Sequence, residues 1–332
     1  MDAAHKWTDK RIEELERKIR KEYSAAAKEM RKIAKERLKD YAEQRSAARE
    51  ALKSGRITKE AFKSHMSTLA VAKARDRELL NALTSVALTP KTSALKLIAF
   101  EAPEVYAENA NFATFLIEKA TRLDTAFTLI DTGTVRKLFE ANPKLLPVKT
   151  TVNEAKDILW HSRKFVSSIT QSILLGESVP DTAKRLSGVL ETDARAAMST
   201  ARTALTAAEN MGRMDSYERA ERMGIRGVKV WEATLDGRTR DSHRQADGER
   251  IPIDEAFSNG LMQPGDPDGE PEEVYNCRCA MRYEVDDVEQ ETVNRFSRLP
   301  SDVSYDDWKA GHYHTNAAGR ETSKSKNMRG VR

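Results

Sequence analysis

The chain has 332 residues, of which 39% are hydrophobic, 6% aromatic and 33% charged. This length suffices for two or three ordinary domains and excludes a single small module, and the many charged and few aromatic residues are typical of solvated helices and not of dense sheets. No apolar run approaches the roughly 20 residues that cross a bilayer, and the first residues do not resemble a signal peptide. We therefore expect a protein that is made in the cytoplasm and has no contact with a membrane.

The net charge of +4 is unevenly distributed along the chain. Residues 10–53 carry fifteen Lys or Arg against nine Asp or Glu, residues 226–300 carry ten against seventeen, and residues 320–332 carry five against one. Basic ends would suit contact with DNA or with an acidic partner. Solvated helix faces and a disordered tail explain the same charges without any partner, and both interpretations stay open.

Near the N-terminus, apolar residues recur at steps of three and four, which predicts an amphipathic helix from about residue 9 to about residue 53. Gly55 is expected to end this helix, because glycine readily adopts the left-handed conformation that closes a helix, and Thr58 to cap the next one. Residues 1–90 are thus predicted to form a long antiparallel helical hairpin, which either docks along another protein or packs on itself as an ordinary bundle. The apolar stripe consists of Ile12, Leu15, Ile19, Tyr23, Ala26, Met30 and Ile33.

Residues 91–225 are predicted to be a central helical region. Thr89-Pro90 is expected to end the hairpin, and Pro103, Pro143 and Pro147 to divide the next residues into short helices, because proline cannot donate the helical hydrogen bond.

A helix is predicted at residues 152–173, followed by a turn that begins at Gly176. A second helix is predicted after this turn, with Asp181 as its cap. Thr192-Asp193 is expected to separate this helix from a further one that starts at Ala194 and stops at Gly224.

Beyond residue 225 the composition changes from helical to strand-like. Residues 228–233 and 280–285 alternate in the manner of strands, and a loop rich in Gly, Pro and Asp lies between them. Residues 226–290 are therefore predicted to be a small α+β domain, and residues 291–332 one short helix and a basic tail. The predicted fold class is mainly α with a small α+β C-terminal domain.

Three side chains that suit a metal ion fall in this small domain, namely His243, Cys277 and Cys279. An imidazole and two thiolates are ligands that zinc prefers, and a loop-rich domain with a small core gains stability from a metal crosslink. A closed site needs a fourth ligand, for which we name Asp236. The other candidates for that position are Asp241, Asp247, His312 and His314.

A different interpretation of the two cysteines remains open. They are separated by one residue only, whereas paired cysteines of a standard zinc finger are separated by two or more. Cys277 and Cys279 could flank Arg278 at the entrance of a strand without converging, while His243 bonds to a loop carbonyl. A catalytic metal or a reactive thiol is a further alternative.

Signals for an enzyme are otherwise absent from the sequence. It has no Gly-rich phosphate loop, no nucleophile elbow and no His-Glu-x-x-His helix, so we expect no catalytic activity.

Arg238, Arg240 and Arg278 are expected to pair with nearby carboxylates, with phosphate contacts as the rival interpretation. Trp231 is expected to belong to the core of the small domain.

These residues also carry a family resemblance. The run from Trp231 through Asp236, Arg238-Thr239-Arg240 and His243 to Asp247-Gly248, closed by Asn276-Cys277-Arg278-Cys279, resembles the head-morphogenesis domain of phage Mu protein F-like minor head proteins. The upstream Gly176, Arg202-Thr203, Asn210 and Gly224 resemble that family too, so the likeness covers roughly residues 150–290. It departs at Ala204, where many relatives have an acidic residue.

The resemblance implies a minor head (capsid) protein of a tailed phage that is bound at or near the portal vertex and acts in head morphogenesis and in genome packaging or ejection. It implies the portal protein as partner, with the major capsid protein, a scaffolding protein and packaged DNA as further candidates, and a place in the virion, inside the head or at the portal vertex. Two alternatives remain, a metal-dependent enzyme or effector delivered with the genome and a nonspecific DNA-binding protein.

Overall fold

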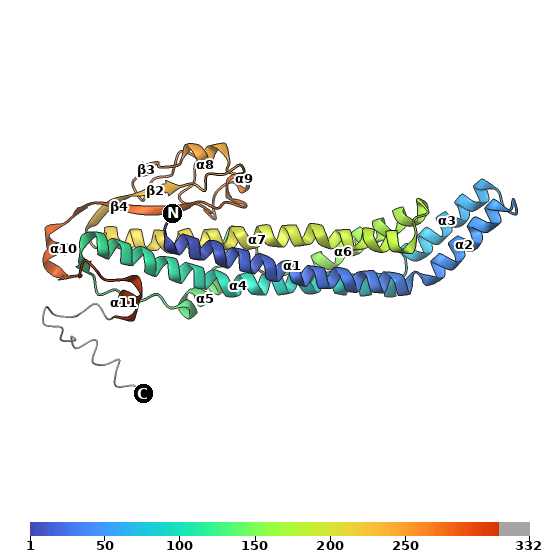
Figure 1. Cartoon of the computed structure of the whole chain (residues 1–332), viewed down its shortest axis with the longest axis horizontal. Coiled ribbons are helices and arrows are strands. Elements are labelled where there is room, and N and C mark those ends of the chain that lie inside the picture. The colour runs from blue at the N-terminus through green and yellow to red at the C-terminus, as the bar shows by residue number, and fades with distance from the viewer. Residues whose placement is uncertain (312–332) are drawn as a thin grey trace, which may run out of the picture. The chain divides into compact units, whose positions relative to one another are not determined.

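The computed structural model describes residues 1–311 of the chain, and helices predominate in this part (Figure 1). The predicted class, mainly α with a small α+β C-terminal part, is confirmed. The helices are α1 (Ala3–Arg37), α2 (Lys39–Lys53), α3 (Lys59–Ala74), α4 (Arg77–Thr121), α5 (Thr132–Ala141), α6 (Glu154–Leu174), α7 (Val179–Arg222), α8 (Asp241–Gln245), α9 (Pro271–Val274), α10 (Gln290–Arg295) and α11 (Tyr305–Ala310), with one 3-10 turn, η1 (Pro143–Leu145). The strands are β1 (Leu123–Asp124), β2 (Ile225–Glu232), β3 (Arg250–Ile251), β4 (Ala280–Val288) and β5 (Ser297–Arg298).

The chain folds into two compact units, and each is assembled from segments that are distant in sequence. Unit 1 comprises residues 1–13, 98–149 and the chain from residue 200 onward, and unit 2 comprises residues 14–97 and 150–199. The sequence analysis divided the chain into contiguous domains instead, because periodicity identifies helices but not which of them share a core.

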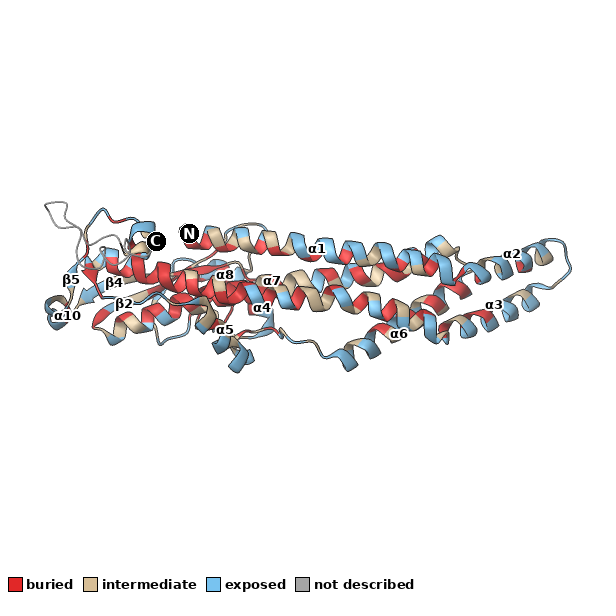
Figure 2. Ribbon diagram, turned by 90° about the horizontal axis from the view of Figure 1, so that it is seen from below, coloured by how far each residue is buried: buried red, intermediate tan, exposed pale blue. Residues whose placement is uncertain are grey.

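Unit 2 contains the predicted amphipathic stripe from Leu15 onward. From Leu15 to Met30 its large members are at most 3% exposed, since they pack on the other helices of the unit, and Figure 2 shows these buried positions in red along α1. The single helix predicted from about residue 9 to about residue 53 is divided into two. The helix α1 ends at Arg37, and α2 begins at Lys39 after Leu38, which is not helical.

The hairpin predicted around Gly55 lies between α2 and α3, two helices that contact each other. Gly55 has φ +73°, and the Thr58 hydroxyl accepts a hydrogen bond from the amide of Ala61 at 3.1 Å, so both the expected stop and the expected cap are confirmed. The helix α3 also packs against α6.

Two predicted helix breaks are wrong. The helix α4 runs through both Pro90 and Pro103. A proline inside a helix costs about 3 kcal/mol, but α4 offsets this cost because it is long and buries apolar side chains on both sides of the two prolines. Those that are at most 1% exposed are Leu79, Leu83, Ala87, Ala94, Ile98, Ala102, Val105 and Ala110.

The break predicted at Thr192-Asp193 is also wrong, because α7 is one helix from Val179 to Arg222. Neither residue has a strong tendency to interrupt a helix, and the Asp193 carboxylate is hydrogen-bonded to His161 of α6 at 2.9 Å. The predicted cap Asp181 is replaced by Ser178 at the start of α7. The Ser178 hydroxyl accepts a hydrogen bond from the amide of Asp181 at 3.3 Å.

Unit 1 contains the sheet, in the order β3-β2-β4 with antiparallel neighbours. Both predicted strands are confirmed, and Val230 of β2 lies opposite Arg282 of β4. Gly224 ends α7 with φ +80°, as expected. Trp231 is fully buried in an apolar cluster with Phe257 and the two cysteines, which confirms its predicted place in the core.

Beyond β4 the structure has two short helices, α10 and α11, where the sequence analysis expected one. The expected basic tail, residues 320–332, lies outside the described residues.

The helices α4 and α7 approach closely at Gly212. The Ser216 hydroxyl donates to the carbonyl of Ala110 at 2.8 Å, and a β-carbon at position 212 would overlap the carbonyl oxygen of Tyr106 and lie 3.2 Å from the amide of Ala110. Only a glycine permits this separation of the two backbones.

We expect Gly212→Ala to lower the free energy of unfolding by about 1–3 kcal/mol, because the extra methyl group forces the two backbones apart. The control is Gly188→Ala in the same helix, where a β-carbon meets nothing within 4 Å; this change should stabilise the helix by up to about 1 kcal/mol. Urea unfolding followed by circular dichroism measures the free energy of unfolding of both variants. If the two changes alter it equally, the close approach of α4 and α7 at Gly212 is contradicted.

The first residues of the chain join unit 1 through buried charges. The Asp2 carboxylate accepts two hydrogen bonds from the fully buried guanidinium of Arg213, at 2.6 and 2.8 Å. The buried His5 ring lies 2.9 Å from the carboxylate of Glu209. Burial lowers the pKa of His5, but the neighbouring carboxylates of Glu209 and Asp9 together raise it more, so the pKa lies above its ordinary value.

Protonated His5 therefore stabilises the folded state at a pH below about 6.5, the pKa of an unfolded histidine. This contribution is lost as the pH rises through the higher pKa of the folded protein. We expect His5→Gln to destabilise the chain more at about pH 5.5 than at about pH 9, as measured by urea unfolding. If His5→Gln lowers the free energy of unfolding by the same amount at both pH values, His5 is not charged in the folded protein.

Candidate metal centre

Three side chains from two segments converge in unit 1. His243 lies in the short helix α8, and Cys277 and Cys279 lie in the segment between α9 and β4. Nδ1 of His243 is 3.6 Å from Sγ of Cys277 and 3.4 Å from Sγ of Cys279. Each of the three residues is 2% exposed, and their ligand atoms all lie within 4.8 Å of one another.

The backbone before the cysteines explains why the two thiols meet. Asn276 has φ +60°, a left-handed conformation that turns the chain sharply, and the amide of Cys277 donates to the carbonyl of Val274 at 3.2 Å. Both cysteines precede the first residue of β4, so the geometry of an extended strand does not apply to them. The interpretation in which the cysteines do not converge and His243 bonds to a loop carbonyl is therefore wrong.

One face of α7 holds the cysteine segment in place through a row of hydrogen bonds. The Thr203 hydroxyl accepts from the amide of Asn276 at 2.9 Å, and the Thr206 hydroxyl donates to the carbonyl of Cys277 at 2.9 Å. The Asn210 side-chain amide then donates to the carbonyl of Cys279 at 3.1 Å.

The row continues into the strand, where Arg213 and Tyr217 both donate to the carbonyl of Met281, at 3.0 and 3.1 Å. These five side chains, Thr203, Thr206, Asn210, Arg213 and Tyr217, are spaced by three or four residues and therefore lie on one face of the helix. We call them the α7 ladder. Sequence analysis named Thr203 and Asn210 only as part of the family resemblance and assigned no structural role to any of the five. The helix α7 carries many other polar and charged residues, so helical spacing alone does not single out this face.

A carboxylate that sequence analysis also missed lies on the far side of the histidine ring. Oε2 of Glu273, in α9, is 3.0 Å from Nε2 of His243 and accepts a hydrogen bond from the Ser242 hydroxyl at 2.7 Å. This position favours the ring tautomer with its proton on Nε2, so that the lone pair of Nδ1 faces the two sulfur atoms. A carboxylate behind a histidine ligand is common in metal sites and orients the ring.

Each of the two thiols changes the pKa of the other. A hydrogen bond from Cys277 and another with His243 lower the pKa of Cys279 despite its burial, and the same contact with Cys279, together with burial, raises the pKa of Cys277. The lowered pKa of Cys279 favours one thiolate in the folded protein, and the thiolate is the form of cysteine that binds a divalent metal.

The distances agree with a tetrahedral zinc site. Zinc bonds of about 2.3 Å to sulfur and about 2.0 Å to nitrogen, at a tetrahedral angle, separate sulfur from nitrogen by about 3.5 Å. The two observed separations, 3.6 and 3.4 Å, bracket this value. The donor set and its burial therefore fit a metal of the zinc type.

The fourth position is not filled by the residue that sequence analysis named. Both oxygens of the Asp236 carboxylate are held by the guanidinium of Arg278, at 2.6 and 2.7 Å, and this contact lowers the pKa of Asp236 well below its ordinary value. Among the described residues, the carboxylates do not join the three-residue group. Asp247, for example, accepts a hydrogen bond from the amide of Ala233 at 2.8 Å. His312 and His314 lie outside the described residues.

The arginines of this region form contacts within the protein. Arg278 pairs with Asp236, Arg238 lies 3.8 Å from the same carboxylate, and Arg240 donates to the carbonyl of Tyr275. The expected pairing with carboxylates is thus seen for Arg278 and Arg238, whereas Arg240 bonds to the backbone.

Known proteins share this region of the chain. Residues 163–282 match the sequence model of the family described as Phage Mu protein F like protein. This region resembles that family. His243, both cysteines, Glu273 and the whole α7 ladder fall within the matched residues, so the candidate metal centre is part of the Phage Mu protein F-like region.

Two curated relatives are similar to this chain. Minor head protein GP7 of Bacillus phage SPP1 is 28% identical over 184 residues, which are 54% of this chain and 59% of that protein. NAD(+)--arginine ADP-ribosyltransferase EFV of Enterococcus faecalis is 25% identical over 206 residues, which are 61% of this chain and 42% of that protein. The chain thus spans about half the length of these relatives, and no solved structure matches it.

We expect the purified chain to contain about one zinc ion, bound by three protein ligands of this donor type, when analysed by elemental mass spectrometry. His243→Ala and Cys277→Ser should each lower the zinc content and the melting temperature, and a strong chelator should do the same to the unchanged protein. Asp236→Asn is the control and should retain the metal, because the Asp236 carboxylate is engaged by Arg278. Loss of zinc from this variant, or its absence from the unchanged protein, would contradict the assignment.

Proposed function

We propose that this chain is a minor head protein of a tailed phage, bound at or near the portal vertex of the virion, and that it acts in head morphogenesis and in genome packaging or ejection. The observation that carries the proposal is the match of residues 163–282 to the Phage Mu protein F like family, together with the similarity to a minor head protein over more than half of the chain. In this role the chain is a structural component and not an enzyme.

The geometry of the metal centre supports a structural role. The cavity beside His243, Cys277 and Cys279 has a volume of about 10 Å³, which is room for about one water molecule. Small-molecule sites typically have about 300–1,000 Å³, so no substrate of ordinary size fits at the cluster. A zinc ion here would crosslink α8 to the segment before β4 and stabilise a sheet of three strands with a small core.

The absence of a membrane span among the described helices is compatible with this proposal. None of the helices in residues 1–311 combines the length and the apolar character that crossing a bilayer requires. Interaction with other proteins of the head, foremost the portal protein and also the major capsid or scaffolding protein, would then use the surfaces of the helices. Contact of the basic segments with packaged DNA is a further part of the proposal.

The two alternative functions make different predictions. A metal-dependent enzyme or effector would lose turnover but not its fold when His243 is changed, whereas a structural zinc site loses the fold. A nonspecific DNA-binding protein would bind DNA with an affinity that falls steeply with salt, because phosphate contacts release counterions. The relative from Enterococcus faecalis adds a concrete assay, the transfer of ADP-ribose from NAD to arginine, which we expect the chain not to perform.

Coexpression with the portal protein encoded in the same phage genome tests the proposal. We expect the chain to elute with the portal oligomer in gel filtration at micromolar concentration, because a stable specific interface buries at least about 1,000 Å². A portal protein from an unrelated phage is the control and should elute separately. Separate elution of the matched pair would contradict the proposed function.

A further inference from the structure

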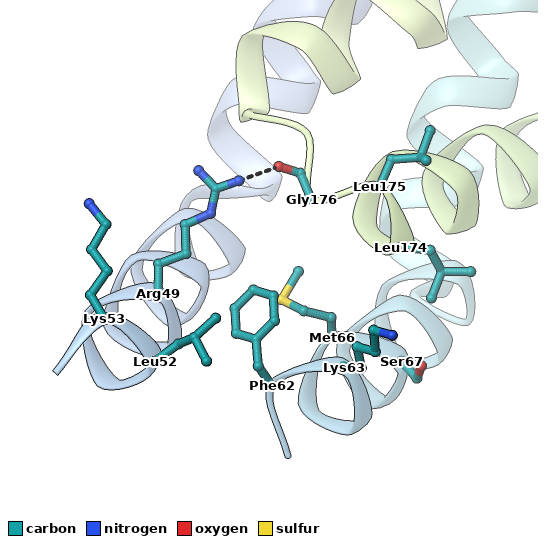
Figure 3. Close-up of a pocket in the computed structure, with 10 residues that line it drawn as sticks. All are labelled: Arg49, Leu52, Lys53, Phe62, Lys63, Met66, Ser67, Leu174, Leu175 and Gly176. Carbon is teal, nitrogen blue, oxygen red and sulfur yellow. Dashed lines mark hydrogen bonds between the residues drawn. The ribbon is translucent and has the colours of Figure 1, made fainter. Parts of the chain in front are cut away.

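Unit 2 contains a pocket of about 590 Å³ that the metal centre does not involve. It lies between α2, α3 and the C-terminal end of α6, and Figure 3 shows the side chains that line it. Its apolar lining comes from Leu52 of α2, Phe62 and Met66 of α3, and Leu174 and Leu175 at the end of α6. We call this pocket the unit 2 groove.

The groove exposes an unusual amount of aliphatic surface. Leu174 is 54% exposed and Leu175 is 70% exposed, and the two are adjacent in sequence. Each square ångström of apolar surface that a ligand removes from water contributes about 25 cal/mol of favourable free energy to binding. A contiguous apolar surface of this kind, rimmed by polar groups, is typical of an interaction site.

The rim of the groove is positively charged. Arg49, Lys53 and Lys63 line it, whereas none of its lining residues is an aspartate or a glutamate. Arg49 donates to the carbonyl of Gly176 at 3.0 Å, and this bond is drawn in Figure 3. Lys53 and Lys63 have no ion-pair partner among residues 1–311, so their charges are available to a ligand.

Hydrogen bonds hold the walls of the groove in a fixed position. Gly176 closes the end of α6 with φ +66°, and its carbonyl accepts from Arg45 of α2 at 2.7 and 3.0 Å as well as from Arg49. The Tyr41 hydroxyl donates to the carbonyl of Glu177 at 2.9 Å. The groove is therefore formed before any ligand arrives, which lowers the entropy cost of binding.

We propose that the unit 2 groove binds an amphipathic helix of a partner protein whose apolar face is flanked by aspartate or glutamate residues. This inference rests on the proposed function, which makes the portal protein the partner that supplies the helix. A groove between helices suits the insertion of two or three apolar side chains spaced by three or four residues. The carboxylates beside them would pair with Lys53 and Lys63, which sets the orientation of the helix.

The same observations disfavour other occupants. DNA binds mainly through its phosphates, which contact Lys and Arg side chains and gain nothing from an apolar surface, whereas the centre of the groove is lined by aliphatic side chains and Phe62. The basic C-terminal segment of this chain would be repelled by the rim, because residues 320–332 carry five basic residues and one acidic residue.

Coexpression with the portal protein, followed by titration of the purified proteins, tests the inference. We expect Leu175→Asp, and separately the pair Lys53→Glu and Lys63→Glu, to weaken binding at least tenfold, because the first puts a charge on the apolar surface and the second repels acidic residues. The matched controls are Leu159→Asp, at an α6 position that is 52% exposed, and the pair Lys28→Glu and Lys35→Glu on α1, and they should bind within twofold of the unchanged protein. All the changed side chains are on the surface, so circular dichroism should show the same fold in each variant.

The outcomes separate the two proposals. If the unchanged chain binds the portal protein and all variants bind equally well, the groove is not the docking site but the proposed function stands. If the unchanged chain does not bind, the proposed function fails and this docking fails with it. A photoreactive amino acid at Ser67, a lining residue, should crosslink to an acidic helix of the portal protein; crosslinking to DNA or to a second copy of this chain would overturn the inference.

Discussion

The α7 ladder is the interaction on which unit 1 depends most. Five polar side chains on one face of α7 bind backbone groups of four residues, Asn276, Cys277, Cys279 and Met281, and one of the five is the fully buried guanidinium of Arg213. A buried cation must be paired, since burying it alone costs several kcal/mol. Arg213 meets this requirement with Asp2, with a carbonyl of β4 and with an asparagine of α4, so three segments that are distant from it in sequence are bound to one side chain.

The candidate metal centre follows from this constraint. Two of the ladder's acceptors are the carbonyls of Cys277 and Cys279, so α7 fixes the backbone from which both thiols extend. The other ligand, His243, comes from a short helix that Glu273 and Trp231 contact, with the Trp231 ring edge-on to the imidazole at 5.2 Å. A site held from both sides in this way is suited to a structural ion, since neither ligand segment needs to move.

The chain thus has two kinds of site with different physical characters. In unit 1 buried polar side chains of α7 hydrogen-bond to the backbone of the cysteine segment and of β4, which holds a small sheet in place. In unit 2 the α2–α3 hairpin and the end of α6 expose apolar and cationic side chains to solvent, which is the surface that we propose a partner covers. A head component that is itself stable and that attaches to a neighbour would need both features.

The sequence by itself determined the helical class, the amphipathic stripe from Leu15 to Met30, the stops at Gly55 and Gly224, the strands around Val230 and Arg282, and the candidate ligands His243, Cys277 and Cys279. These follow from local rules, namely periodicity, backbone conformation and side-chain chemistry, which need no knowledge of distant residues. Only the tertiary structure decided that α4 continues through Pro90 and Pro103, that Asp236 pairs with Arg278, that Glu273 lies behind His243, and that α7 binds the cysteine segment. Each of these depends on residues far apart in the chain, whose contacts and burial outweigh local preferences and leave no local signal in the sequence.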